Sequence, residues 1–81
     1  MPDPDIIPLE APLNANVWKL LVEEGEEIKA DHLVSILEAM KLEINVKADD
    51  NMVGGKVEKL LVRQGDVVSA GKAMVLVRRK T

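Results

Sequence analysis

The sequence predicts an all-β domain made of two similar halves that share one core. Three observations lead to this prediction. Short segments rich in Val, Leu and Ile alternate along the chain with Gly, Asp and Asn, which is typical of strands joined by turns. The chain aligns with itself at an offset of 40 residues. Its 81 residues are also too few for two independent cores, so the two copies must bury their apolar faces against each other.

The internal repeat relates residues 17–37 to residues 57–77 without a gap. Seven of the 21 aligned positions are identical, including a glycine that each half places after its aliphatic segment. Other positions are conservative exchanges, such as Ile28 for Val68. Because neither half is large enough to bury its own apolar face, we expect a pseudo-two-fold axis to relate them.

The expected elements follow in chain order. Residues 1–7 contain two prolines and are expected to form an extended leader or linker, with the domain occupying residues 8–81. Turns are expected at Gly25 and Gly65, because glycine tolerates a positive φ. Strands are expected at the aliphatic segments, which are residues 17–22, 33–38, 42–47, 57–62 and 73–78.

The segment from residue 33 to residue 46 fits two structures. Its apolar spacing matches one face of a helix, and most of its central residues are good helix formers. The repeat favours strands, because the counterpart at 73–78 contains β-branched residues in a short apolar run. Two strands require the chain to reverse between them, which places Ala39, Met40 and Lys41 at a hairpin tip. This turn lacks the usual Asn-Gly or Asp-Gly, so its backbone is expected to be strained.

Composition excludes several classes of function. Without cysteine, the chain offers no disulfide, no thiolate metal site and no cysteine nucleophile. Its net charge of −3 argues against a nucleic-acid partner, and no apolar run is long enough for a membrane partner. The single histidine, His32, has no second His or Cys to complete a metal site and is expected at the surface. We identify neither a catalytic residue nor a metal ligand.

The segment from Glu38 to Glu43, Glu-Ala-Met-Lys-Leu-Glu, closely resembles the biotin-attachment motif of biotinyl domains, which belong to the biotinyl/lipoyl attachment family. The resemblance covers about residues 8–79 and includes the pattern Val-x-x-Gly-(Asp/Glu)-x-(Ile/Val) in both halves. It implies a flattened eight-stranded barrel-sandwich hybrid of two pseudo-two-fold related halves. It also implies covalent biotin on Lys41, with Ala39, Met40 and Leu42 as flanking recognition residues.

The function implied by this resemblance is that of a biotin carboxyl carrier. Biotin on Lys41 would act as a swinging arm between a biotin carboxylase site and a carboxyltransferase site of an ATP- and bicarbonate-using carboxylase. A biotin protein ligase and these two catalytic domains are the implied partners. Because the cofactor supplies the chemistry, the domain is expected to catalyse nothing by itself. We expect an isolated monomer in the cytoplasm, and a mitochondrial parent enzyme also fits.

The sequence departs from the family pattern at two places. Leu42 stands where a second Met is usual, which is a nearly volume-conserving exchange. Residues 13–16 lack the glycine that usually precedes the first valine, although the second half keeps Gly54-Gly55. The thumb insertion of bacterial acetyl-CoA carboxylase carriers has no room here, because the repeat aligns without a gap.

Two alternative functions remain open at this point. A lipoyl carrier of the same fold usually has Asp-Lys-Ala at its hairpin, which Met40 and Leu42 do not match. An unmodified interaction module usually lacks a Met-Lys pair and carries a helical insertion there. Trp18, whose repeat mate is the charged Glu58, is expected to cover one side of the barrel, with a partner contact as its other interpretation. The acceptor of the carboxyl group, whether urea, an acyl-CoA or pyruvate, also remains open.

Overall fold

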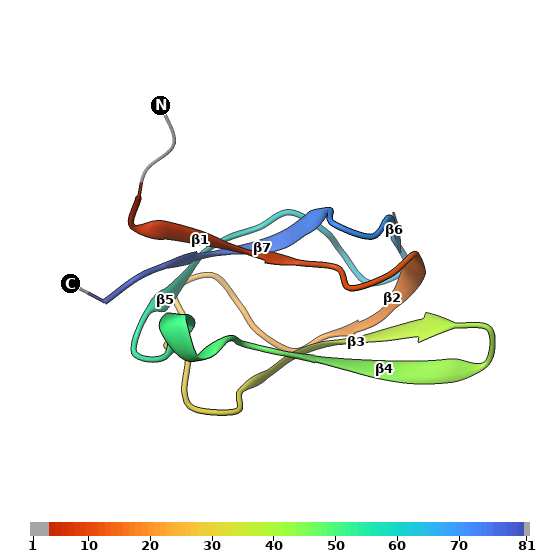
Figure 1. The fold of residues 1–81 in the computed structure, drawn as a ribbon, viewed down its shortest axis with the longest axis horizontal. Helices are drawn as coiled ribbons and strands as arrows, with labels where there is room; N and C mark the ends of the chain where they lie inside the picture. The colour runs from red at the N-terminus through yellow and green to blue at the C-terminus, as the bar shows by residue number, and fades with distance from the viewer. Residues whose placement is uncertain (1–3, 81) are drawn as a thin grey trace.

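The computed structural model describes residues 4–80 and confirms an all-β fold of two antiparallel sheets (Figure 1). One sheet has the strand order β1-β7-β5, formed by Ile6–Glu10, Ala73–Arg78 and Lys56–Leu60. The other has the order β4-β3-β2-β6, formed by Leu42–Lys47, Leu33–Ala39, Ala15–Leu20 and Val67–Val68. One turn of 3₁₀ helix, η1 (Asp50–Met52), connects β4 to β5. In this described part of the chain, no helix has the length and apolarity to cross a membrane.

An isolated bridge takes the eighth strand position in residues 4–80. Glu27 pairs with Lys56 at the outer edge of β5, as Val67 of β6 pairs with Asn16 at the edge of β2. The Ile28 amide donates to the Gly55 carbonyl at 2.8 Å and closes this bridge. The barrel-sandwich architecture is therefore present in residues 4–80. The order β1-β7-β5 followed by the bridge at Glu27 in one sheet corresponds to the order β4-β3-β2-β6 in the other.

Each half of the chain supplies an edge to the sheet of the other half. Strand β6 comes from the second half but pairs with β2 of the first. The backbone hydrogen bonds repeat this exchange: the Val17 amide donates to the Asp66 carbonyl at 2.8 Å, and the Val57 amide donates to the Glu26 carbonyl at 2.9 Å. The pseudo-two-fold relation expected from the repeat is thus part of the hydrogen bonding that joins the halves.

The core lies between the two sheets and is built from aliphatic side chains and methionine. Repeat-related residues enter it in pairs, such as Val17 with Val57, at 1% and 2% exposure. Among the described residues, Ser35 is the buried polar side chain, and its hydroxyl donates to the Lys19 carbonyl at 2.7 Å. That bond offsets the cost of removing the hydroxyl from water.

Strands β2 and β5 carry β-bulges at twin positions. The pairing register of β2 shifts between Val17 and Lys19, and that of β5 shifts between Val57 and Lys59. Trp18 is therefore the inserted residue of the first bulge. It is 43% exposed, so it covers the sheet only in part.

Two expectations about particular segments have different outcomes. The segment that fitted both a helix and strands forms β3 and β4, as the repeat predicted. The leader expected over residues 1–7 requires correction, because β1 begins at Ile6 and the buried Ile7 pairs with Val77. Proline fixes its own φ and disfavours helical backbone in the residue before it, but extended backbone stays allowed, so Ile6 and Ile7 can pair with β7. Residues 1–3 of that leader lie outside the described part.

Gly55 and Ala15 occupy twin positions and provide a matched test of packing. A Cβ on Gly55 would collide with the Arg78 carbonyl oxygen and lie 3.0 Å from the Met52 carbonyl oxygen. We expect Gly55→Ala to lower the free energy of unfolding by about 2 kcal/mol, because backbone must move. Ala15→Gly should cost about 1 kcal/mol or less. Urea unfolding followed by circular dichroism measures both, and equal losses would contradict the close approach.

Candidate functional site

The hairpin between β3 and β4 brings the predicted site residues together at its tip, at the right of Figure 1. Strand β3 ends at Ala39, β4 begins at Leu42, and these two residues pair. Met40 and Lys41 form the turn, with φ angles of 50° and 69°. Two consecutive positive φ angles are typical of the tight turn whose twist matches that of the strands.

The backbone of this turn is strained, as the sequence predicted. The left-handed region costs a residue other than glycine about 1–2 kcal/mol, and both turn residues adopt it. The backbone pairing of β3 with β4, which extends from Leu33 and Lys47 up to the turn, offsets the energy of this strain. The tip is therefore held in a defined geometry by strands whose own stability comes from the core.

Lys41 presents a free amine at this tip. Its side chain is exposed, and within residues 4–80 it takes part in no hydrogen bond or ion pair. The neighbouring Met40 and Leu42 are 94% and 67% exposed, although both are apolar. The arrangement presents an unpaired amine between two exposed apolar side chains. It therefore fits a residue that is to be acylated.

Two carboxylates face each other directly below the tip. Glu38 pairs with Glu43 across the hairpin, and both side chains are exposed. Like charges at such positions destabilise a strand pair by a few tenths to about 1 kcal/mol. Because side chains alternate between the faces of a strand, the carboxylates lie on the face opposite to Ala39 and Leu42. The hairpin thus has an acidic outer face and an apolar inner face.

The hairpin tip lies at the opposite end of the domain from the start of β1 and the end of β7 (Figure 1). The longest extent of the domain is 39 Å. The Arg79 amide donates to the Asp5 carbonyl at 2.6 Å, where β7 ends and β1 begins. This place corresponds to the hairpin tip in the other sheet. A partner can therefore approach Lys41 without meeting this other end.

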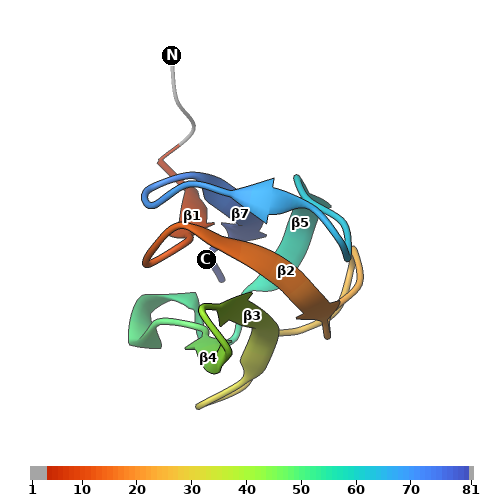
Figure 2. The same ribbon diagram turned by 90° about the vertical axis from the view of Figure 1, so that its right-hand side faces the viewer.

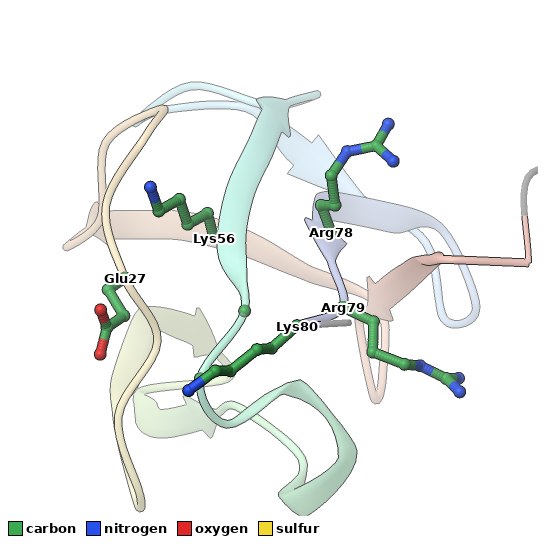
Figure 3. A pocket seen from close by; sticks show the side chains of 7 residues that line it. Glu27, Lys56, Arg78, Arg79 and Lys80 are labelled. Atoms are coloured by element: carbon green, nitrogen blue, oxygen red, sulfur yellow. The ribbon is translucent and has the colours of Figure 1, made fainter.

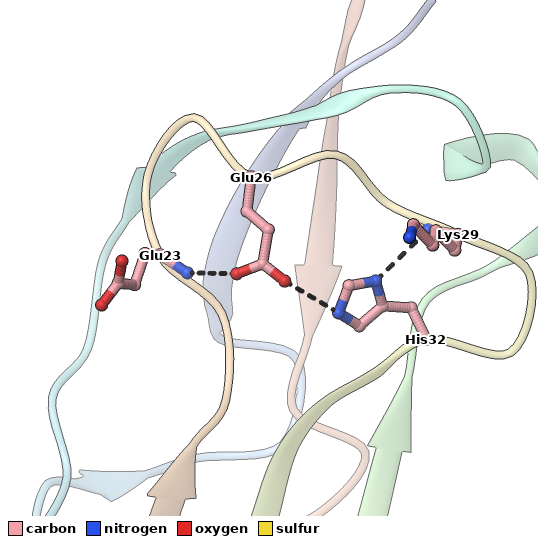
Figure 4. A network of polar contacts seen from close by, with 4 residues as sticks. All are labelled: Glu23, Glu26, Lys29 and His32. Carbon is pink, nitrogen blue, oxygen red and sulfur yellow. Dashed lines mark hydrogen bonds and ion pairs between the residues drawn. The ribbon is translucent and has the colours of Figure 1, made fainter.

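His32 braces the loop that precedes β3 (Figure 4). Its Nδ1 accepts a hydrogen bond from the Lys29 amide at 3.2 Å, and its Nε2 lies 3.2 Å from Glu26 Oε2. The second carboxylate oxygen of Glu26 accepts a hydrogen bond from the Glu23 amide. The His32 side chain is 18% exposed, so it is less accessible than the surface histidine that the sequence suggested. The described residues contain no cluster of three potential metal ligands.

A cavity of about 340 Å³ lies beside the end of β7, which is opposite to the β3–β4 hairpin in Figure 1, and Figure 3 shows the side chains that line it. Its lining contains four cationic side chains and one carboxylate around two glycines, which are Glu27, Gly54, Gly55, Lys56, Arg78, Arg79 and Lys80. Among residues 4–80, the lining contains no hydroxyl, imidazole or thiol side chain. It is separate from the hairpin site.

Comparison with known proteins supplies the context for this hairpin. The family model described as "Biotin-requiring enzyme" matches residues 1–77. A putative urea carboxylase of Emericella nidulans is 54% identical to the chain over 77 residues, which are 95% of this chain and 6% of that protein. The chain therefore spans a small part of the length of this relative.

Two solved structures have the same fold. A single-chain, multi-domain long-chain acyl-CoA carboxylase matches with a TM-score of 0.86 at 28% identity, over 99% of this chain and 8% of that one. The urea carboxylase of Kluyveromyces lactis matches with a TM-score of 0.80 at 35% identity, over 95% of this chain and 6% of that one.

Substitutions at Lys41 should separate backbone strain from side-chain contacts. Lys41→Gly is expected to raise the free energy of unfolding by about 1 kcal/mol, because glycine accepts a positive φ without strain. Lys41→Ala keeps the strain and removes an unpaired side chain, so its stability should stay within about 0.5 kcal/mol of the parent. Thermal and urea unfolding measure both variants. A loss of stability in Lys41→Gly would show that the side chain makes contacts that stabilise the hairpin.

Proposed function

Because this chain belongs to the family of biotin-requiring enzymes, we propose that Lys41 is the residue to which its biotin is attached. The chain is a biotin carboxyl carrier domain of the kind found in multidomain carboxylases, and it is not catalytic by itself. The observation that supports Lys41 most strongly is its exposed, unpaired amine at the tip of a constrained hairpin. The relatives named as carboxylases and biotin carboxyl carriers favour biotin over the two alternatives, a lipoyl carrier and an unmodified module.

Attachment requires an activated form of biotin, such as its acyl-adenylate. The Lys41 nitrogen would attack the carboxyl carbon and form an amide, with release of AMP and of one proton from the amine. A biotin protein ligase is the partner that we propose for this step. Met40 and Leu42 would supply apolar contacts to it, while Ala39 keeps the hairpin narrow beneath them. Once bound, biotin supplies a ureido nitrogen that carries an activated carboxyl group.

The contribution of the chain is to hold the base of the arm. The ladder between β3 and β4 fixes the position of Lys41 relative to the core, so the mobility of the arm begins beyond the turn. Tethering to a larger enzyme gives the arm a high effective concentration at each catalytic site. The biotin carboxylase and carboxyltransferase domains are the partners proposed here, with an isolated domain that is monomeric and an enzyme in the cytoplasm.

Urea carboxylase is the parent enzyme that the similarities favour. Identity to the Emericella nidulans urea carboxylase is 54%, against 39% for the carrier protein of an acetyl-CoA carboxylase, 38% for a pyruvate carboxylase and 28% for the long-chain acyl-CoA carboxylase. Restoration of urea-dependent ATP hydrolysis tests this assignment. The biotinylated chain should restore activity to a urea carboxylase that lacks its carrier domain, and a restored acyl-CoA carboxylase alone would contradict it.

Intact mass after incubation with a biotin protein ligase, biotin and ATP tests the attachment site. The parent chain should gain one biotinyl group, and Lys41→Arg should gain none. Lys47→Arg is the matched control on the same hairpin and should be modified like the parent. Equal modification of Lys41→Arg would place the biotin elsewhere. A parent that gains no biotin but accepts lipoate from a lipoyl ligase would support the lipoyl carrier.

A further inference from the structure

The pseudo-two-fold relation provides an internal control for exposed apolar residues. Twin positions share their backbone hydrogen bonds, so an apolar side chain that the fold requires at one position should recur at the other. Leu21 and Leu61 meet this criterion, because they are twins and are 42% and 39% exposed. Their exposure is a property of the fold and needs no partner.

Four other exposed apolar residues have charged twins. Trp18 corresponds to Glu58, Val67 to Glu27, Met40 to Lys80 and, through the matching registers of β4 and β1, Leu42 to Asp5. The fold therefore tolerates charge at each of these positions. All four apolar residues belong to the sheet β4-β3-β2-β6 or to its hairpin. Since the fold does not require them, their common location indicates contact with another molecule.

Two of these residues extend the apolar character beyond the hairpin tip. Val67, which is 74% exposed, lies in a row across the sheet with Asn16, Glu38 and Glu43. Strands are spaced by about 4.8 Å, so Val67 lies about 10 Å across the sheet from Glu38. Trp18 follows Asn16 by two residues within the bulge of β2. We call the surface formed by Trp18, Val67, Glu38 and Glu43 the Trp18–Val67 surface.

The Trp18–Val67 surface combines an aromatic side chain with nearby charge. The Lys19 ammonium lies 4.9 Å from the centre of the Trp18 ring, which keeps one cation at the far edge of the surface. At the hairpin edge, Glu38 and Glu43 provide two negative charges without a cation paired to them in the described residues. A complementary partner would present an apolar patch next to positive charge. Figure 2 views the domain from this end.

We propose that the Trp18–Val67 surface docks onto a biotin carboxylase domain while the arm on Lys41 occupies its active site. This inference rests on the proposed function. A biotin carboxylase binds ATP and bicarbonate, which are both anions, so the mouth of its active site must carry positive charge. That charge complements Glu38 and Glu43. Weak contact is sufficient, because a tethered carrier has a high effective concentration.

The position of the surface favours the carboxylase over the ligase. A ligase must bring its reacting atom to the Lys41 nitrogen itself, so its contacts are concentrated at the turn. An attached biotin places the reactive nitrogen beyond the lysine by the length of the biotinyl group. A partner that receives this longer arm has room to rest on the sheet behind the tip, where Trp18 and Val67 lie.

The double substitution Trp18→Glu with Val67→Glu tests the proposal. It installs the residues found at the twin positions, so the fold should accommodate it, and circular dichroism checks this. Lys59→Glu is the matched control, because it also changes the net charge by −2 but lies on β5 of the other sheet. Each protein is biotinylated to completion by mass. It is then given to a urea carboxylase without its own carrier domain, with ATP and bicarbonate.

The expected result is a rise of about tenfold or more in the KM for the double variant, with kcat within about twofold of the parent. The Lys59→Glu control should stay within about twofold in both constants. An unchanged KM in the double variant would overturn the proposal. A rise confined to the KM of the ligase would also overturn it and would assign the surface to the ligase. Failure of the parent chain to accept biotin would instead contradict the proposed function.

Discussion

The exchange of edges between the two halves is the interaction on which the rest of the structure depends. The Gly65 amide donates to the Val17 carbonyl at 2.7 Å, and the Gly25 amide donates to the Val57 carbonyl at 2.8 Å. These bonds join the turn at Gly65 to strand β2 of the first half and the turn at Gly25 to strand β5 of the second half. One half alone would expose an unpaired strand edge and half of a core, so neither is expected to fold separately. Chain length and repeat therefore lead to the same architecture.

The hairpin between β3 and β4 takes its geometry from this shared core. Leu37 is fully buried beneath the tip, and its strand lies between β2 and β4. That support allows Met40 and Lys41 to keep positive φ angles that other residues would occupy at lower energy. The strain is located at the turn that carries Lys41, the biotin-attachment residue proposed above. The proposed role of the domain is to hold Lys41 in a defined position, while the attached biotin would react at the catalytic sites of other domains.

The sequence predicted the fold class, the hairpin and the position of Lys41, because these follow from a repeat that can be counted. It could not place the start of β1, since pairing of Ile6 and Ile7 depends on β7, which lies about 70 residues away along the chain. It also could not reveal the bulge at Trp18, which shifts register without a glycine to mark it. The half-buried state of His32 likewise depends on the loop conformation that brings Glu26 within reach.

The connection from β4 to β5 has a consequence for assembly. Ala11 and Ala48 occupy equivalent positions, because their amides donate to the carbonyls of the twin residues Lys72 and His32. The segment from Ala48 to Gly55 is nevertheless three residues longer than the segment from Ala11 to Ala15. The extra residues form η1, whose Met52 is buried in the core. Two molecules could in principle trade halves and keep every cross-half bond, as in domain swapping. Because Met52 anchors η1 in the core, the connection spans a shorter distance than its length would allow. This favours pairing of the two halves within one molecule over the swapped dimer.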